Sequence, residues 1–276
     1  MQNEDYYEIQ RVLKHLDDRR ADGADVALVA ADAGLSVDEL EQLCDRWCEV
    51  EAEYFIECAL ALDSRLVAQV QRAEQLDTDY SMPGERRKMK RNRPNRFQIA
   101  EPSDAERLGI IYGFIPSPYG QCLLGLIEER VCHLAYTLED ETAAVTLLKE
   151  AWKGFKIDHD QEAIDRFSEK NFAEFDATHL DICLPPAAKN FQIGVSNLIQ
   201  DIPSGSVCSY GELASRLGSP KGARAVGSAA AKNTIAELIP CHRIVGSSGS
   251  TGGYRWGADR KRAILLREHI LLNHHW

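Results

Sequence analysis

A cysteine between a proline and a histidine is the feature of this sequence best suited to chemistry. Cys241 lies in the apolar stretch 239–245, with Pro240 before it and His242 and Arg243 after it. A thiol reacts as its thiolate, and a neighbouring imidazole or basic side chain is the usual means of lowering its pKa. Pro240 fixes one backbone torsion beside the sulfur. A cysteine in an apolar stretch can equally be a small buried core residue, so the surrounding sequence has to decide between the two.

The cysteine belongs to a basic part of an acidic chain. The formal net charge of −11 would by itself argue against a nucleic-acid partner. Residues 205–276, however, carry ten basic and four acidic side chains, whereas residues 1–80 carry seven basic and twenty acidic ones. A locally basic module is what a phosphate-binding surface requires. The charge distribution therefore predicts that the region around Cys241 binds nucleic acid.

Length and composition exclude several classes of protein. A chain of 276 residues, 44% of them hydrophobic, is long enough for more than one domain with a good core. No apolar stretch approaches the roughly 20 residues of a membrane span, and the polar start after Met1 is not typical of a secretory signal. Eight cysteines without paired spacing favour free thiols in a reducing compartment. We therefore expect a cytoplasmic or nuclear protein, with no membrane partner, no metal site and no cofactor.

Two short helices are predicted ahead of the cysteine. Ser209 is a helix cap for residues 210–217, the sequence Gly-Ser-Pro at 218–220 ends that helix, and a second helix follows over 223–232. Together they form a helix-turn-helix plan. The second helix consists mainly of alanine, glycine and serine. Such residues allow a helix to approach a narrow DNA groove closely, but they read almost nothing at the base edges.

The middle of the chain is predicted to be a sheet followed by helices. Strands over 110–115, 122–127 and 131–137 are separated by turn sequences and form an antiparallel meander. Charged helical sequence then runs from Glu141 to about Phe175. A further helix begins near residue 189, and its buried face is predicted to contain Phe191, Val195, Leu198 and Ile199.

The first 80 residues contain another helix-turn-helix pattern. An alanine-rich helix over 25–33 ends at Gly34, and Ser36 caps the next helix in a capping box with Glu39. This segment resembles one such unit of the AraC-type regulators. The second helix is acidic and would repel phosphates. Two interpretations therefore remain: a module that reads DNA, or a helical module that serves packing or protein contacts.

Six motifs occur in a fixed order in the basic part of the chain: Ser209–Ala214, Arg224–Gly227, Asn233, Pro240–Arg243, Gly253–Gly257 and Leu265–Glu268. Their order and spacing resemble the O6-alkylguanine-DNA alkyltransferases. The Tyr-Arg-Trp-Gly sequence at 254–257, together with the first helix-turn-helix, is closest to the adaptive-response type. The four-cysteine zinc module of that type is missing, which removes the methylphosphotriester-sensing role. Ser196 and Thr234 replace a tryptophan and a proline that are common in the family.

The resemblance implies an α/β multidomain fold. It places an AraC-type helix-turn-helix-like helical module at 1–80 and a basic linker at 81–100. A ribonuclease-H-like antiparallel sheet with helices follows at 101–187. A winged-helix-like helix-turn-helix catalytic domain occupies 188–276.

The resemblance also implies the reaction and the catalytic roles. Cys241 accepts an alkyl group from O6 of guanine, or O4 of thymine, in a single irreversible turnover. His242 takes the thiol proton through a water, and Glu268 orients the imidazole. Asn233 fixes the loop and the thiolate by hydrogen bonds. Tyr210 turns the flipped nucleotide and protonates guanine N3.

The implied partner is double-stranded DNA, bound through its minor groove by a monomer. The target base must leave the stack to reach the thiol, and Arg224 fills the vacated position. Tyr254 and Arg255 line the alkyl pocket. The remaining contacts to DNA or to the base are assigned to Ser228, Ala229, Ala230, Arg243 and Val245.

Two other functions are compatible with parts of the sequence. A lesion sensor or transcriptional regulator would bind alkylated DNA without removing the group, but proteins of that kind lack the cysteine. A cysteine hydrolase could pair Cys241 with a distant histidine such as His179, which leaves Arg224 and the alanine-rich helix without a purpose.

Overall fold

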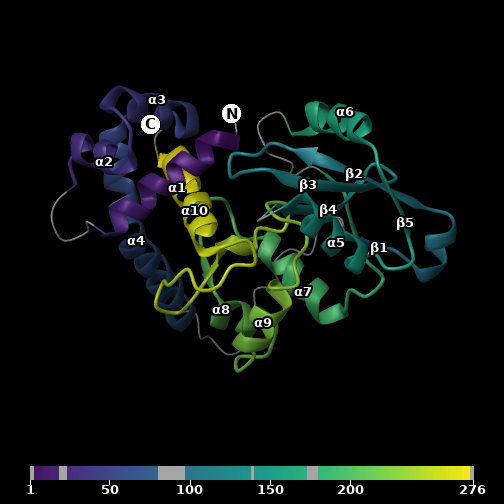
Figure 1. The fold of residues 1–276 in the computed structure, drawn as a ribbon. Helices are drawn as coiled ribbons and strands as arrows, with labels where there is room; N and C mark the ends of the chain where they lie inside the picture. Colours follow the sequence, from purple (N-terminus) through teal and green to yellow (C-terminus); the bar gives the residue numbers. More distant parts are fainter. Residues whose placement is uncertain (1–2, 19–23, 80–96, 138–139, 173–179, 274–276) are drawn as a thin grey trace.

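A computed structural model describes residues 3–18, 24–79, 97–137, 140–172 and 180–273, which form helices around one large mixed sheet and a small two-stranded one (Figure 1). The fold is therefore α/β. Of the expected linker 81–100, residues 81–96 lie outside the described part, and so does His179. Residues 97–99 do not continue a linker but form the first strand of the sheet.

The large sheet has the strand order β1-β6-β4-β3-β2-β5. Its strands are β1 (Phe97–Ile99), β2 (Gly109–Ile115), β3 (Cys122–Ile127), β4 (Arg130–Tyr136), β5 (Lys156–His159) and β6 (Ile182–Leu184), with a 3-10 turn at Pro102–Glu106. The meander β2-β3-β4 is antiparallel, which confirms the prediction for these strands. The expected wholly antiparallel sheet is wrong, because β1 and β4 pair in parallel with β6, and β2 pairs in parallel with β5.

The long helical stretch expected over 141–175 is also wrong. It is divided into α5 (Glu141–Ala151), strand β5 and α6 (Gln161–Asn171), with residues 173–175 outside the described part. Gly154, at a φ of 96°, turns the chain after α5. Ile157 then pairs with Ile110 at the sheet edge, and Asp160 caps α6 by accepting from the Ala163 amide. Strand pairing thus overrides the helical character of this charged sequence.

The described N-terminal residues, 3–18 and 24–79, form four helices: α1 (Asn3–Asp18), α2 (Val26–Ala33), α3 (Val37–Cys48) and α4 (Ala52–Asp79). The predicted turn is confirmed, since Gly34 adopts a φ of 73°. The predicted capping box is confirmed as well, with the Ser36 hydroxyl accepting from the Glu39 amide. Leu40, Leu43 and Trp47 of α3 are fully buried.

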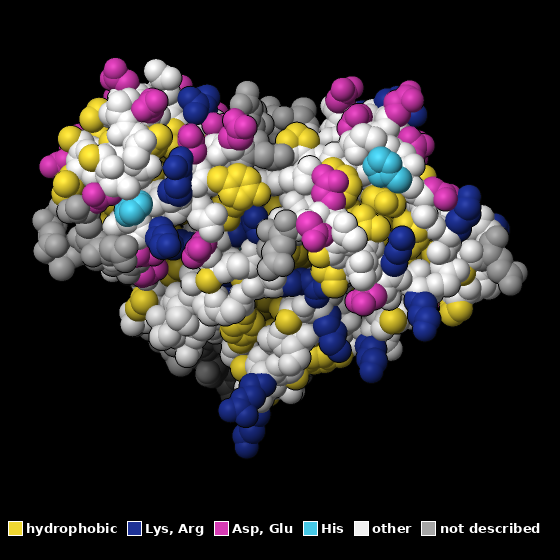
Figure 2. Space-filling view, in the orientation of Figure 1, with side chains coloured by type: hydrophobic (Ala, Val, Ile, Leu, Met, Phe, Trp, Pro, Cys, Tyr) yellow, Lys and Arg dark blue, Asp and Glu magenta, His cyan; other side chains and the backbone are white. Residues whose placement is uncertain are grey.

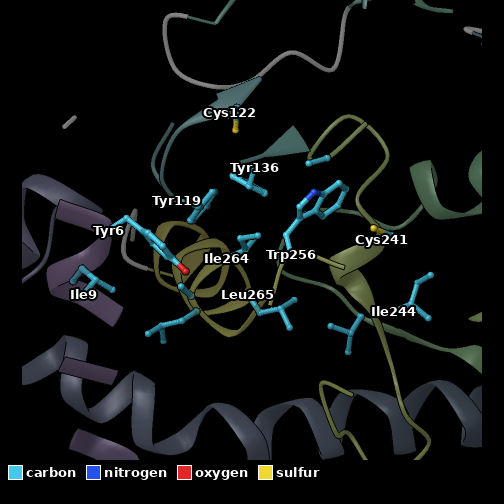
Figure 3. Packing of buried hydrophobic residues seen from close by; sticks show 14 of the residues in the cluster. Tyr6, Ile9, Tyr119, Cys122, Tyr136, Cys241, Ile244, Trp256, Ile264 and Leu265 are labelled. Carbon is cyan, nitrogen blue, oxygen red and sulfur yellow. The ribbon is translucent and has the colours of Figure 1, made fainter. Parts of the chain in front are cut away.

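Helices α1, α3 and α4 pack against the last helix, α10 (Ala258–Asn273), and α2 packs against those three helices. Figure 3 shows Ile264 and Leu265 of α10 between Tyr6 of α1 on one side and Trp256 on the other. The Trp47 indole donates to the carbonyl of Pro118 at 2.8 Å. The N-terminal helices therefore belong to the same hydrophobic core as the region of Cys241.

Elements ahead of the cysteine form the remaining part of the fold: α7 (Asn190–Gln200), β7 (Cys208–Ser209), α8 (Tyr210–Arg216) and α9 (Ala223–Ala230). After them come the 3-10 turn η2 (Cys241–Arg243) and β8 (Ile244–Val245). Val195 and Ile199 of α7 are buried as predicted, but Phe191 is 43% exposed because it lies on the outer side of the first turn. Strands β7 and β8 pair in parallel, which places the start of α8 beside the end of the cysteine turn.

No helix within the described ranges has both the length and the apolar character needed to cross a membrane.

Candidate active site

The loop that precedes the cysteine is attached to the sheet. The amide of Leu134 in β4 donates to the carbonyl of Thr234 at 2.9 Å, and the amide of Ala236 donates to the carbonyl of Leu134 at 2.6 Å. Strand β4 pairs with β6 only at Val131, and the bridge between Leu134 and Ile235 lies further along the strand. The sheet therefore fixes where the loop enters the site.

Asn233 organises that loop and contacts the sulfur. Its amide nitrogen donates to the carbonyl of Ile239 at 2.8 Å, to that of Ile235 at 3.2 Å and to Cys241 Sγ at 3.2 Å. Its carbonyl oxygen accepts from the Ile235 amide at 3.0 Å. One buried side chain thus holds both the loop backbone and the thiol, as the family resemblance implies for this position.

Cys241 is the first residue of η2 and only 7% exposed. Burial raises the pKa of its thiol to about 11, although the Asn233 hydrogen bond and the positive charge of Lys261 oppose that rise. The resting sulfur is therefore a thiol at neutral pH. A nucleophilic reaction requires a base that removes its proton during the reaction.

The next residue provides an imidazole that is linked to a carboxylate. His242 Nε2 lies 2.9 Å from Glu268 Oε1. The guanidinium of Arg243 also binds Glu268, at 2.6 Å from Nη2, and donates to the carbonyl of Ile202 at 2.7 Å. Burial raises the pKa of Glu268, but His242 and Arg243 outweigh burial and lower it to about 2. An ionised carboxylate only accepts hydrogen bonds, so His242 carries its proton on Nε2.

Helix α10 supplies a second group that holds the cysteine turn. Lys261 is buried, and its ammonium donates to the carbonyls of Ile244 and Thr251, both at 2.5 Å. Burial lowers its pKa to about 8, while a negative charge on Cys241 would act in the opposite direction. Sequence reasoning did not identify Lys261, because the basic sequence at 260–262 has the pattern of a solvated helix face.

Two tyrosines lie near the thiol. Burial raises the pKa of Tyr210 at the start of α8, and the nearby Cys241 raises it further. Burial and the same thiol raise the pKa of Tyr254 well above its usual value. The hydroxyl of Tyr254 is buried without a hydrogen-bond partner among the described residues. Each of these hydroxyl groups therefore remains protonated and can donate a hydrogen bond.

The small-residue helix packs directly against Tyr210. A Cβ built on Gly227 of α9 would lie 3.7 Å from the Tyr210 ring. Arg224 and Ser228 are exposed, whereas Ala229 and Ala230 are each only 8% exposed and face inward. The outer surface of α9 is consequently formed by Arg224, Ala225 and Ser228, and little of Ala229 or Ala230 remains for contact with DNA.

Basic side chains are concentrated near this helix. Lys221, Arg224, Lys232 and Arg255 are exposed, and Figure 2 shows lysine and arginine side chains along the lower face, where α8 and α9 lie in Figure 1. Arg255 donates to the carbonyl of Ala231 at 3.1 Å, just after α9. Val245 is buried in β8, beside Ser209 in the small ladder.

The structure thus brings Cys241, His242, Glu268, Asn233 and Tyr210 into one site. Arg224 is exposed on α9, and Arg255 is exposed beside the end of that helix. Sequence reasoning also missed Glu237, whose carboxylate lies 3.7 Å from His242 Nδ1. A single acidic residue in the apolar stretch 235–241 was the signal that could have identified it. Among the described residues, no group of three histidine, cysteine or acidic side chains is placed to hold a metal ion.

A buried thiol, a neighbouring imidazole–carboxylate pair and a basic small-residue helix define a class of DNA-associated proteins with a reactive cysteine. The family model "6-O-methylguanine DNA methyltransferase, DNA binding domain" matches residues 190–270. A methylated-DNA–protein-cysteine methyltransferase of Methanosarcina acetivorans is 32% identical over 160 residues, which cover 57% of this chain and 97% of that protein. The chain belongs to this methyltransferase family.

Two further proteins are similar to part of this chain. The bifunctional transcriptional activator/DNA repair enzyme Ada of Escherichia coli is 36% identical over 169 residues, covering 59% of this chain and 46% of Ada. The chain therefore spans about half the length of Ada. The protein chain in the structure titled "Crystal structure of Mycobacterium tuberculosis OGT in complex with DNA" is 31% identical in sequence to this chain. The TM-score is 0.44, and the alignment covers 58% of this chain and 92% of the OGT chain.

Proposed function

We propose that the protein repairs DNA by moving an alkyl group, typically methyl, from O6 of guanine to its own Cys241. O4 of thymine is a second acceptable donor. The observation that carries this proposal is the buried thiol, which is hydrogen-bonded by Asn233 and adjoins a histidine linked to Glu268. Membership of the methyltransferase family supports the same reaction.

The bonds and protons of the reaction balance with these residues. Sγ attacks the alkyl carbon, an S–C bond forms, and the C–O6 bond breaks with its electron pair passing to the guanine. The thiol proton moves to His242, directly or through one water, because a thiol with a pKa of about 11 does not ionise alone. Tyr210 protonates guanine N3 and recovers a proton from solvent. Water does not displace the thioether, so each molecule acts once.

DNA binding is assigned to the exposed surface of α9. Arg224 enters the stack at the flipped base, Ser228 and Arg255 contact the backbone, and the small side chains let the helix enter the minor groove. Tyr254 and the backbone near Val245, whose own side chain is buried, are assigned to the bound base. We infer that α8 and α9 act as the helix-turn-helix of a winged-helix-like domain, and that a monomer in the cytoplasm or nucleus performs the repair.

The proposal assigns separate roles to the parts of the chain. Residues 188–276 form the catalytic domain, and residues 101–187 form its ribonuclease-H-like companion. Residues 1–80 serve packing and not DNA reading, because the apolar face of α3 is buried and its outer face carries Asp38 and Asp45. The transcriptional role named for Ada is not assigned to this chain.

The test is a transfer assay with duplex DNA that contains O6-methylguanine, read by mass spectrometry of the peptide with Cys241. One added methyl mass at Cys241 is expected, and an unmodified peptide from a folded protein would contradict the proposal. A bulkier benzyl substrate in the same assay defines the range of accepted groups.

A Cys241→Ala variant separates repair from lesion sensing. The variant should bind methylated DNA with wild-type affinity and transfer nothing. Cys183→Ala, which removes another buried thiol in strand β6, is the matched control and should transfer normally. A sensor without chemistry would leave both the wild-type protein and the Cys241→Ala variant equally unmodified.

A further inference from the structure

The catalytic histidine lies between two carboxylates. Glu268 holds Nε2 at 2.9 Å from one side, and Glu237 Oε1 lies 3.7 Å from Nδ1 on the other. His242 is only 1% exposed, and its Nδ1 has no hydrogen-bond partner among the described residues. A buried ring nitrogen without a partner is uncommon in folded proteins. The nitrogen that must receive the thiol proton therefore faces a fixed acidic group.

Glu237 is held in place from two directions. The hydroxyl of Tyr136 in β4 donates to its carboxylate at 2.8 Å. Its backbone has a φ of 60°, a left-handed conformation that is uncommon outside glycine. The amide of the preceding residue, Ala236, donates a hydrogen bond to the carbonyl of Leu134 in β4. The sheet thus fixes both the backbone and the carboxylate on the Nδ1 side of the imidazole.

Other charged and titratable groups also surround the Cys241–His242 pair. Helix α10 contributes Glu268 and Lys261, and Arg243 lies against Glu268. Tyr210 of α8, Tyr254 and Tyr136 of β4 complete the set. Lys261 and Arg243 are positively charged, and Glu268 already accepts the hydrogen bond from His242 Nε2. Glu237 is consequently the anionic group placed to act on Nδ1.

We propose that Glu237 is a positioning carboxylate for the alkyl transfer, which stabilises His242 once Nδ1 has taken the thiol proton. The inference rests on the proposed repair function. In the resting state, the lone pair of Nδ1 faces a carboxylate, which is unfavourable. After proton transfer, an N–H group faces the same carboxylate, which is favourable. The two states thus differ in a way that drives the proton from sulfur to nitrogen.

The same negative charge also acts on the sulfur. Burial is the main cause of the high pKa of the Cys241 thiol, and the charge of Glu237 contributes to it. Glu237 therefore disfavours an isolated thiolate but favours a thiolate paired with a protonated ring. The thiol remains protonated between encounters with DNA, and its proton leaves only when His242 receives it.

The experiment compares Glu237→Gln with the wild-type protein over a range of pH. The thiolate of Cys241 is the nucleophile, so the reaction rate rises with pH as the thiol loses its proton. Because the negative charge of Glu237 contributes to the high pKa of the thiol, its removal should move this rise toward acid by about one pH unit. A merely structural role would lower the rate without moving the rise.

Two variants control for folding and backbone conformation. Glu129→Gln removes a carboxylate from an exposed residue with a φ of 62°, remote from the site, and should leave the pH profile unchanged. Glu237→Asn removes the charge with a residue that tolerates the left-handed conformation better. If the Glu237→Gln variant folds poorly, the Glu237→Asn variant takes its place and should show the same shift of the pH profile.

Two rates are measured for each variant. One is methyl transfer from O6-methylguanine DNA, and the other is modification of Cys241 by iodoacetamide, followed on its own peptide. A wild-type pH profile in folded Glu237→Gln or Glu237→Asn protein would overturn the role of Glu237. A shifted iodoacetamide profile in a protein that accepts no methyl group would support that role and overturn the proposed repair function.

Discussion

Two pairs of short helices, α2–α3 and α8–α9, have the same local design in opposite surroundings. In each pair a serine caps a helix: the Ser36 hydroxyl accepts from the Glu39 amide at 3.2 Å, and the Ser209 hydroxyl accepts from the Glu212 amide at 3.1 Å. A glycine with a positive φ ends a helix in both, Gly34 after α2 and Gly218 after α8. Local sequence rules therefore describe both pairs equally well.

The second helices of the two pairs differ in what they bury and what they expose. Helix α3 buries large apolar side chains such as Trp47 and leaves an acidic outer face. Helix α9 has only small side chains apart from Arg224 and Val226, and exposed lysine and arginine residues surround it. A helix-turn-helix plan thus does not by itself predict DNA binding. Burial and surface charge decide whether the second helix supports the core or meets a phosphate backbone.

The largest expected effect is on folding and comes from α3. Trp47→Ala should lower the free energy of unfolding by about 3–5 kcal/mol, because it leaves a cavity and removes the bond to Pro118. Ser228→Ala on the exposed side of α9 should change stability by less than about 0.5 kcal/mol. Chemical denaturation measures both. Unchanged stability in Trp47→Ala would show that α3 is not a core helix.

The second effect is on repair and comes from α9. Arg224→Ala should slow transfer from duplex DNA by about tenfold or more, with unchanged stability, because a stacking and phosphate contact is lost. The slope of the logarithm of the DNA-binding constant against the logarithm of the salt concentration should become shallower by about one unit. Arg46→Ala removes a comparably exposed arginine from α3, where it pairs with Asp5. If the α3 variant lost DNA affinity instead, the contrast between the two pairs would be wrong.

The smallest expected effect concerns the two helix-capping serines, Ser36 and Ser209. Ser36→Ala and Ser209→Ala should each cost about 1 kcal/mol of stability, since each leaves one helix amide without its acceptor. Their effects on transfer should differ, because Ser209 precedes Tyr210 and Ser36 is remote from the thiol. Single-turnover rates at saturating DNA test this difference. Equal rates in the two variants would mean that the cap does not position Tyr210.

The sequence was sufficient where the determinants are local. The meander is marked by its turns, the helix starts by their caps, and the cysteine turn by neighbouring residues. The short strands β1, β5 and β6 were not predicted, because three or four residues carry little periodicity and their pairing partners are distant in the chain. The predicted burial of Phe191 failed for a similar reason, since its environment depends on tertiary packing.

The site was predictable to the same extent. Family spacing predicted Cys241, His242, Glu268 and Asn233, and the structure brings them together. Lys261 and Glu237 were missed because charged side chains are normally solvated. Only the tertiary fold shows that one is buried beneath the cysteine turn and that the other faces the imidazole.

The contacts between the N-terminal helices and α10 have a consequence for the order of folding. Arg262 of α10 binds Asp17 across a sequence separation of 245 residues, and Gln10 binds Asp259 across 249. During synthesis the N-terminal helices emerge first and can pack on one another, but the apolar surface that contacts α10 stays uncovered until residues 258–273 have left the ribosome. Contacts of such long range slow folding. The protein should consequently complete its core late, and its nascent chains should depend on chaperones more than a chain whose domains close in order.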